Sequence, residues 1–541
     1  MSSKIFKISM IAATVSAAFS ANAALYQVFH YADGNSAKSF GVAIQPSDLN
    51  CWENDCIGDH DVKHQIAYEG KDYNEGFEYR HESPFLTRLG FDYIDSGDDI
   101  WSNFRNYCYN YLRYADTLCE NWATNQYTYG YLNEESGDLK GTQSFVMSNT
   151  VTPVHDALGN VVVNSLSSNS EAIGNYQTMT RRNTAFFGED ELFTDGDRSR
   201  AWASLEDTGT RYIVGSVSNK VSYNSTDYTS NPVVWEIDTT TSDITLKTIS
   251  WASGAGSNDR IQPQGAARDI ALIEGSIYAV GYNSDSDEYL RAAVFSRDSI
   301  SGEWSSQFIS GFDSGDRSIS NYLNSVVSAV NNNGKAVGTY KLRDIVVNGS
   351  YSNGLFYVSN VRSPSPKATL FNDSVLFYGA NGKAGGINND DLVVGAVDFE
   401  THREYNGKPR AQRAFITTLD ASNSTPIKSS YYLDDLTYTS SDPSFNNEYR
   451  ILDATDINDA GVISGTAYYC AGGFSTYSIA SSCENGSEIV AVKLVPLSND
   501  TYAERDIEKR PASEADKVDR QGASLGFFAL MLLSFLGFRR K

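Results

Sequence analysis

The sequence predicts an all-β protein, a β-propeller of seven blades with a small disulfide-stapled helical insertion near the N-terminus. Three observations support this fold. A hairpin pattern recurs, in which two apolar runs flank a corner rich in Asn and Gly, as in VVSAVNNNGKAVGTY at residues 326–340. A further strand candidate follows each hairpin, as in a propeller blade. Tyr (34), Phe (26) and Gly (42) are abundant against Pro (12), which suits β-structure with many turns.

The recurring corner has a physical reason. Asn and Gly tolerate the positive φ that a tight hairpin turn needs, and β-branched residues flank them. The most regular copies are residues 326–340, 385–397 and 454–467, and less regular copies are residues 165–176, 204–217 and 267–282. Their closing glycines, 41 to 70 residues apart, are Gly174, Gly215, Gly281, Gly338, Gly395 and Gly465.

The strand candidates that follow the hairpins complete the repeat. They are residues 184–189, 231–237, 291–297, 354–360, 413–419 and 489–495. Six copies and one more in the first third of the chain give seven blades. A blade buries its faces only against its neighbours, so we expect a closed ring in which residues 24–31 complete the last blade. The alternatives are an open β-solenoid and two smaller β-domains.

Both ends of the chain are predicted to be targeting signals. Lys4 and Lys7 precede an apolar run and the small-residue motif Ala21-Asn22-Ala23, so residues 1–23 are predicted to be a signal peptide cleaved between Ala23 and Ala24. The propeller repeat domain then covers residues 24–504, with residues 40–147 as the first blade and its insertion. Residues 505–521 are charged and contain Pro, which predicts a linker.

A short hydrophobic tail ends the chain. Residues 522–541 contain a 14-residue apolar stretch at 525–538 followed by three basic residues. A membrane span usually needs about 20 apolar residues, so a processing signal is favoured over a permanent single-pass anchor.

The six cysteines are Cys51, Cys56, Cys108, Cys119, Cys470 and Cys483. An even number in an exported protein favours disulfides. Cys470 and Cys483 flank a Gly/Ser-rich loop and are expected to pair. If residues 104–122 form one unbroken helix, Cys108 and Cys119 lie about 16 Å apart and must pair with Cys51 and Cys56. If the helix breaks near Asp116, the local pairs 51–56 and 108–119 form instead; we favour the first arrangement.

The net charge of −24 argues against nucleic acid as a partner, because phosphate would be repelled. No cofactor is predicted. Alternate acids such as Asp285 and Asp287 are candidates for Ca²⁺ ligands, although they lack the distal Glu of an EF-hand and suit a solvated turn. His60 and His64 are spaced like metal ligands, but no H-E-x-x-H motif accompanies them. Asp269 and Asp456 are candidates for hydrogen-bonded staples between strands.

Three regions resemble known families. The pattern A-x-x-I-N-x-x-G-x-V-V-G followed by R-A-F, seen at residues 387–395 with 413–415, resembles the HAF-type extracellular repeat. The tail resembles the GlyGly-CTERM sorting signal through Gly522, Ser524 and Gly526, with Ala523 where a second Gly is expected. The whole arrangement is similar to an uncharacterised surface-protein family of marine Gram-negative bacteria, a domain of unknown function.

These resemblances imply an exported protein, transiently held in the inner membrane by its tail. Its partners would be signal peptidase, a rhombosortase-type intramembrane protease and the type II secretion machinery, and its destination the cell surface, the outer membrane or the medium. We expect a binding or interaction module that takes a glycan or protein at the channel mouth or on the insertion. The alternatives are a polysaccharide hydrolase or lyase with paired carboxylates in the channel, and a Ca²⁺-stabilised structural adhesin. Residue spacing identifies no catalytic pair.

Overall fold

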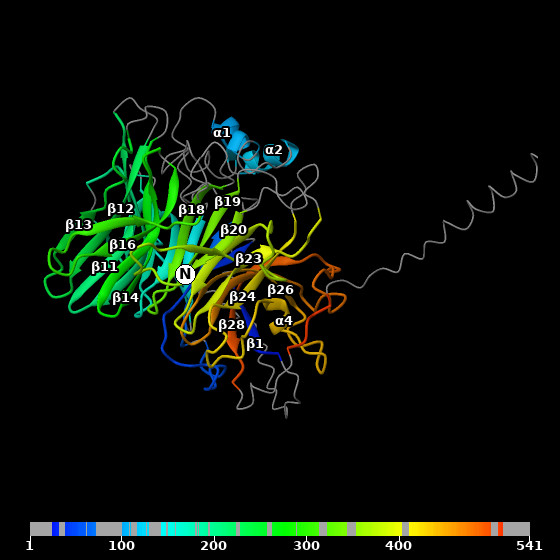
Figure 1. Ribbon diagram of the computed structural model, residues 1–541. Coiled ribbons are helices and arrows are strands. Elements are labelled where there is room, and N and C mark those ends of the chain that lie inside the picture. Colours follow the sequence, from blue (N-terminus) through cyan, green and yellow to red (C-terminus); the bar gives the residue numbers. More distant parts are fainter. Residues whose placement is uncertain are drawn as a thin grey trace, which may run out of the picture.

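The computed structural model describes residues 24–31, 38–71, 100–128, 142–312, 322–342, 353–402, 410–498 and 507–511, with gaps of up to six residues within these ranges. The strands of these residues form seven four-stranded antiparallel sheets, which are the blades of a β-propeller (Figure 1). The predicted fold and blade count are therefore confirmed. The predicted processing residues Ala23, Gly522, Ser524 and Gly526 lie outside the described residues. Ala24, on the other side of the predicted cleavage site, is described.

Each blade runs from an inner to an outer strand. Blade 1 contains β2 (Ser39–Ile44), β3 (Ile66–Lys71), β4 (Thr142–Met147) and β5 (Val151–Pro153). Blade 2 contains β6 (Gly159–Leu166), β7 (Ala172–Gln177), β8 (Thr184–Phe187) and β9 (Asp190–Glu191). Blade 3 contains β10 (Arg198–Asp207), β11 (Thr210–Lys220), β12 (Tyr228–Asp238) and β13 (Ile244–Thr248). Blade 4 contains β14 (Gly265–Ile273), β15 (Ser276–Ser284), β16 (Leu290–Arg297) and β17 (Trp304–Phe308).

The last three blades follow the same order. Blade 5 contains β18 (Tyr322–Val330), β19 (Ala336–Leu342), β20 (Asn353–Val358) and β21 (Ala368–Leu370). Blade 6 contains β22 (Gly382–Ile387), β23 (Leu392–Asp398), β24 (Gln412–Thr418) and β25 (Tyr431–Tyr432), and the short helix α4 (Leu433–Leu436) follows it. Blade 7 contains β26 (Tyr449–Ile457), β27 (Ile463–Tyr469), β28 (Glu488–Pro496) and, from the other end of the chain, β1 (Tyr26–Tyr31).

The ring is closed by β1, as the sequence predicted. It pairs antiparallel with β28 from Tyr26↔Pro496 to Tyr31↔Ala491. Each of the seven inner strands contacts the inner strand of the next blade, and β26 contacts β2 across the seam. Neighbouring blades pack through buried apolar side chains, such as Val214 and Val234 of blade 3 with Phe295 of blade 4. Each fully buried side chain of this kind contributes roughly 1.5–3 kcal/mol.

The closing glycines of the hairpins occupy crowded positions in the second strands. In all six copies the inner strand bulges opposite the glycine, and a Cβ placed there would lie 1.9 to 2.3 Å from a carbonyl oxygen of that strand. At Gly338 this oxygen belongs to Val326. No real Cβ tolerates such a distance, so each of these six positions requires glycine.

The asparagines of the hairpin corners join the blades. The Oδ1 atom of Asn388 accepts hydrogen bonds from the N–H groups of Asp390 and Leu392 in its own turn, while its Nδ2 donates to the carbonyl of Asn458 in the next blade. Asn331 donates in the same way to Asn388, and Asn458 to Gln45. One side chain thus closes its own turn and binds the following blade.

The insertion between β2 and β3 covers the seam between blades 7 and 1. The N–H of Cys51 donates to the carbonyl of Ala460, and the ring of Trp52 packs edge-on against Tyr26 at 5.2 Å. Cys51 pairs with Cys56, and Cys470 pairs with Cys483 as predicted. Our favoured pairing of Cys51 and Cys56 with the helix is therefore wrong.

The predicted continuous helix over 104–122 is also wrong. The structure has two helices, α1 (Ile100–Tyr107) and α2 (Asp116–Thr124), which lie at one end of the propeller (Figure 1). They contact each other through an ion pair of Arg105 with Asp116 and a hydrogen bond from Trp101 Nε1 to Thr124. This break removes the reason for the long-range pairing. Cys119 is disulfide-bonded, whereas Cys108 lies outside the described residues.

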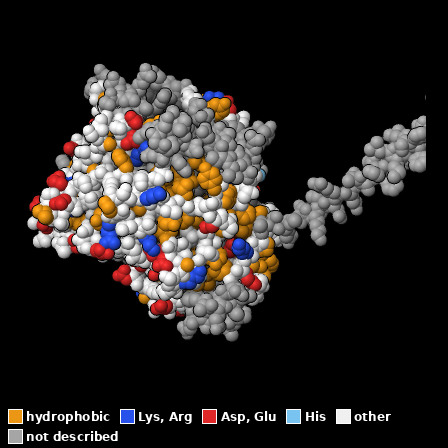
Figure 2. Space-filling view, in the orientation of Figure 1, with side chains coloured by type: hydrophobic (Ala, Val, Ile, Leu, Met, Phe, Trp, Pro, Cys, Tyr) orange, Lys and Arg blue, Asp and Glu red, His pale blue; other side chains and the backbone are white. Residues whose placement is uncertain are grey.

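None of the helices in the described ranges is long and apolar enough to cross a membrane. The face shown in Figure 2 carries scattered acidic and basic side chains, and hydrophobic side chains gather over the region of β20, β23 and β26.

Candidate functional site

The inner strands border the central channel of the propeller. Because neighbouring blades cover the faces of these strands, their partly exposed side chains are the ones that face the channel. On β10 and β14 these include Trp202 and Arg268, and on β22 and β26 they include Lys383, Asp453 and Thr455. The channel lining is therefore our candidate binding site.

An aromatic and a cation meet where β10 and β14 approach each other. The guanidinium carbon of Arg268 lies 3.6 Å from the ring centroid of Trp202. A cation over an indole face is attracted by about 0.5–2 kcal/mol, depending on how far water is excluded. Both side chains are half-buried, so the pair presents an ordered, amphipathic surface to a ligand.

Farther round the ring, an ion pair joins channel positions of blades 6 and 7. The Nζ of Lys383 lies 3.0 Å from Oδ2 of Asp453, and the lysine side chain is 62% exposed. An exposed pair of this kind adds less than about 1 kcal/mol to stability. The ammonium of Lys383 remains open to water and hence to a polar ligand, whereas the side chain of Asp453 is only 23% exposed.

Two half-buried carboxylates hold the inner strands together. Asp269 accepts hydrogen bonds from the N–H of Ile270 and, across the blade boundary, from that of Val330 at 2.8 Å. Asp456 does the same with Ile457 and, across the seam, with Ile44 at 3.0 Å. The prediction that Asp269 and Asp456 staple strands is confirmed, and each staple joins two blades.

Burial dominates the ionisation of both staples. It raises the pKa of Asp269 and that of Asp456 to about 7, against the hydrogen bonds that favour the charged form. The charge of Asp456 raises the pKa of Asp269 further, so the two carboxylates interact across the channel region. A pKa near 7 suits acid–base chemistry, but both oxygens of each group already accept main-chain hydrogen bonds.

The histidines of the insertion have structural surroundings. His60 stacks on Phe29 at 3.7 Å, and His64 is buried with its Nε2 3.6 Å from the sulfur of Cys51. Burial and the charge of Lys493 lower the pKa of His64 to about 4, so it is neutral. Donor atoms of Cys51, Cys56 and His64 lie within 4.8 Å of one another, but the disulfide ties up both sulfurs, so this set does not fit a metal.

The candidate Ca²⁺ ligands lie in the turn between β15 and β16. Asp285 accepts hydrogen bonds from the N–H groups of Asp287 and Tyr289, and its second oxygen pairs with Arg291 at 2.9 Å. A cation bound here would have to displace Arg291. Calcium binding at Asp285 and Asp287 stays a prediction.

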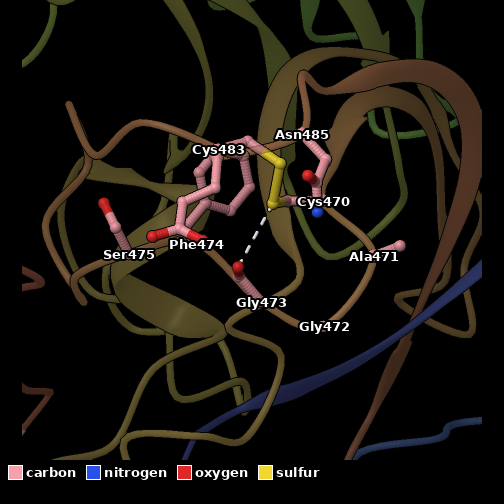
Figure 3. Close-up of a pocket in the computed structure, with 9 residues that line it drawn as sticks. Cys470, Ala471, Gly472, Gly473, Phe474, Ser475, Cys483 and Asn485 are labelled. Carbon is pink, nitrogen blue, oxygen red and sulfur yellow. Dashed lines mark hydrogen bonds between the residues drawn. A yellow bond between two sulfur atoms is a disulfide. The ribbon is translucent and has the colours of Figure 1, made fainter.

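A cavity of about 370 Å³ lies inside the loop that Cys470 and Cys483 close (Figure 3). Its lining includes Gly472, Gly473, Phe474 and Asn485. The sulfur of Cys470 is 3.2 Å from the carbonyl oxygen of Gly473, a contact that Figure 3 marks. The loop between β27 and β28 of blade 7 forms this cavity, and none of the channel residues named above lines it.

A family profile described as "protein of unknown function (DUF3466)" matches residues 207–541, more than half of the chain. The chain belongs to this family. The match begins at the end of β10, so this DUF3466 member has two complete blades before the matched region. The HAF-type repeat, the sorting signal and a marine origin remain resemblances.

A comparison with curated proteins gave no match. Among solved structures, the chain is similar to a member of a mannoside phosphorylase family described as containing glycoside hydrolases that target β-1,2 mannosidic linkages in Candida mannan. The identity is 9%, the TM-score 0.27, and the match covers 60% of this chain and 90% of that one. A glycoside hydrolase from Parabacteroides distasonis is 12% identical, with a TM-score of 0.27, and the match covers 59% of this chain and 90% of that one. A thermostable family-43 glycoside hydrolase is 11% identical, with a TM-score of 0.25, and the match covers 57% of this chain and 94% of that one. We draw no functional conclusion from these likenesses.

Sequence reasoning missed the channel residues of the DUF3466 member. Trp202 and Arg268 each lie 13 residues before a closing glycine, and Lys383 and Asp453 each lie 12 residues before one. Counting back from the glycine to the bulge would have identified these positions.

Proposed function

We propose that the protein is a secreted β-propeller, held at the cell surface through its processed tail, that binds a glycan or protein ligand at the mouth of its channel. Signal peptidase, a rhombosortase-type protease and the type II secretion machinery are its proposed processing partners. The net charge of −24 supports an extracellular ligand rather than nucleic acid.

One observation carries binding over catalysis. The two half-buried carboxylates of the inner strands, Asp269 and Asp456, use both oxygens in main-chain hydrogen bonds that hold neighbouring blades together. Among the described channel side chains that can meet a ligand are an indole under a guanidinium and an ion pair with an exposed lysine. Aromatic faces and charged groups recognise sugars and polar peptides without transferring a proton.

A glycan array with the mature fragment, residues 24–521, tests this proposal. Replacing Trp202 by Ala is expected to weaken binding to the best array ligand at least about tenfold, or 1.4 kcal/mol. Trp304→Ala is the matched control, because that indole lies on the outer strand β17 and donates to Glu236. Equal binding by all three proteins, each with native melting behaviour, would exclude the channel as the ligand site.

The proposed anchoring at the cell surface needs a separate test. Deleting residues 522–541 is expected to move the protein from the cell surface into the medium or the periplasm, as measured by labelling of intact cells. Unchanged surface labelling of the deletion variant would contradict anchoring through the tail.

A polysaccharide hydrolase is the second candidate, favoured by the pKa values near 7 of Asp269 and Asp456. If it is correct, the mature fragment releases reducing ends from a surface polysaccharide, and Asp269→Asn abolishes this release while binding persists. The binding proposal expects no release by either protein.

A further inference from the structure

The chain returns to the propeller after β28. Residues 507–511 lie within the segment expected to be a linker, and they pack beside blades 6 and 7. Ile507 contacts the apolar core of these blades. The carboxylate of Glu508 accepts hydrogen bonds from both the N–H and the hydroxyl of Ser440, at 2.7 and 2.8 Å.

Arg510 is the centre of this contact, with an exposed fraction of 2%. Its N–H donates to Oδ1 of Asp435 at 2.8 Å, and its guanidinium donates to the carbonyls of Asp434 and Tyr477. The guanidinium carbon lies 5.0 Å from the ring centroid of Tyr438. A buried cation is tolerated only where acceptors surround it, and these carbonyls with the ring of Tyr438 provide such surroundings for Arg510 except at its Nη2, which has no hydrogen-bond partner among the described residues.

The disulfide loop of blade 7 forms the other wall. The N–H of Ile479 donates to the carbonyl of Pro511 at 2.8 Å. Arg450, which is 1% exposed, holds this loop by donating to the carbonyls of Ser478 and Thr476. The Cys470–Cys483 bond closes the loop, so the disulfide also orders the surface that receives Arg510.

We propose that α4, residues 438–447 and the Cys470–Cys483 loop form a binding surface for residues 507–511, and that this segment is a clasp fixing the C-terminal tail to the propeller. The occupant is the chain's own segment Ile-Glu-Lys-Arg-Pro, recognised through a buried arginine flanked by a glutamate and a proline carbonyl.

The clasp decides where a pull on the tail acts. Without it, tension would reach β28 directly, and β28 is the strand that pairs with β1 to close the ring. With it, tension is taken up by blades 6 and 7 before it reaches the seam. Ten residues separate Pro511 from Gly522, which allows at most about 40 Å between the clasp and the sorting motif. This tether role depends on the proposed surface anchoring, whereas the clasp itself does not.

Hydrogen exchange of the full chain tests the clasp. Arg510→Ala is expected to speed exchange at least about tenfold in peptides covering 437–442 and 476–482, because the partners of the segment lose protection. The peptide 265–284 of blade 4 should not change. Lys509→Ala is the matched control, since Lys509 is exposed, adjacent and equally charged.

Glu508→Gln gives a second test that leaves Arg510 in place. It is expected to speed exchange in 437–442 more than in 476–482, because the carboxylate of Glu508 accepts its hydrogen bonds from Ser440, which lies in the first of these two segments. Unchanged exchange in Arg510→Ala, or an equal increase in 265–284, would overturn the clasp. A failure of tail anchoring shows up separately, in the surface labelling of the 522–541 deletion.

Discussion

At the residue scale, single atoms decide which side chains the blades accept. The closing glycines look like turn residues in the sequence, but they lie within strands, opposite bulges of the inner strand. Their role is to leave room for a carbonyl oxygen rather than to permit a positive φ. Blade 1 differs, because its paired position holds Tyr68, which lies opposite Gly41 of the inner strand, and a Cβ at Gly41 would lie 2.2 Å from the carbonyl oxygen of Gly465 in blade 7.

Gly338→Ala is expected to destabilise the protein by about 1–3 kcal/mol or more, because its Cβ would lie 2.1 Å from the carbonyl oxygen of Val326. Denaturant titration of the mature protein measures this loss. Gly58→Ala is the control, since a Cβ there meets nothing within 4 Å. Similar midpoints for the two variants would show that the bulge adjusts freely.

The two staples predict a pH dependence. The folded pKa of Asp269, about 7, lies above the roughly 3.9 of an unfolded chain, so the folded state binds the proton more tightly between these values. Its contribution to stability is present below pH 4 and is lost as the pH rises through 7. The lost amount is on the order of 4 kcal/mol, since each pKa unit corresponds to about 1.4 kcal/mol.

Asp269→Asn removes this charge and is expected to become more stable relative to the wild type between pH 5 and pH 8. Urea unfolding at both pH values gives the difference. Glu484→Gln, on an exposed loop, should keep a constant difference from the wild type. Parallel stability curves for Asp269→Asn and the wild type would show that this carboxylate ionises normally.

At the element scale, the hairpin corner combines a turn with a joint. Its Asn is explained by turn geometry alone in the sequence, which predicts the hairpin but not the bond to the next blade. That bond depends on how blades are placed side by side, which local spacing does not encode. The cysteine pairing was mispredicted for a similar reason. It depended on a helix break that the apolar periodicity of residues 104–122 did not reveal.

Asn388→Ala is expected to cost about 1–3 kcal/mol, because two turn N–H groups lose their acceptor and the carbonyl of Asn458 loses its donor. Thermal melting and hydrogen exchange of β22 and β23 provide the measurement. Asn360→Ala is the control, since Asn360 is exposed and accepts from Arg362 within its own turn. An equal cost for both variants would mean that the inter-blade bond adds nothing.

At the scale of the whole molecule, the repeats predicted the ring, its blade number and its closure by residues 24–31. The channel site was not predicted, because Trp202 and Arg268 come from different blades and meet only after the ring has formed. Long-range placement of this kind also hides the clasp, whose residues look like a solvated linker in the sequence. Local patterns therefore predict the blades, and the joints between blades carry the candidate sites.

Closure makes the seam the place where the ring is most easily tested. Val28 is 5% exposed and belongs to the apolar core that β1 shares with blades 6 and 7, whereas the neighbouring Gln27 points to the other face of β1 and is half-buried. Val28→Asp buries a carboxylate without a cation, which typically costs about 3–5 kcal/mol.

Because β1 is joined to its blade by pairing with β28 and by this core, we expect it to detach as a unit and leave β28 as an open edge. Exposed edges pair with other chains. Val28→Asp should therefore lower the melting temperature and form oligomers in size-exclusion chromatography, while Gln27→Asp stays monomeric. If Val28→Asp also elutes as a native monomer with unchanged melting, the ring does not depend on β1 for its closure.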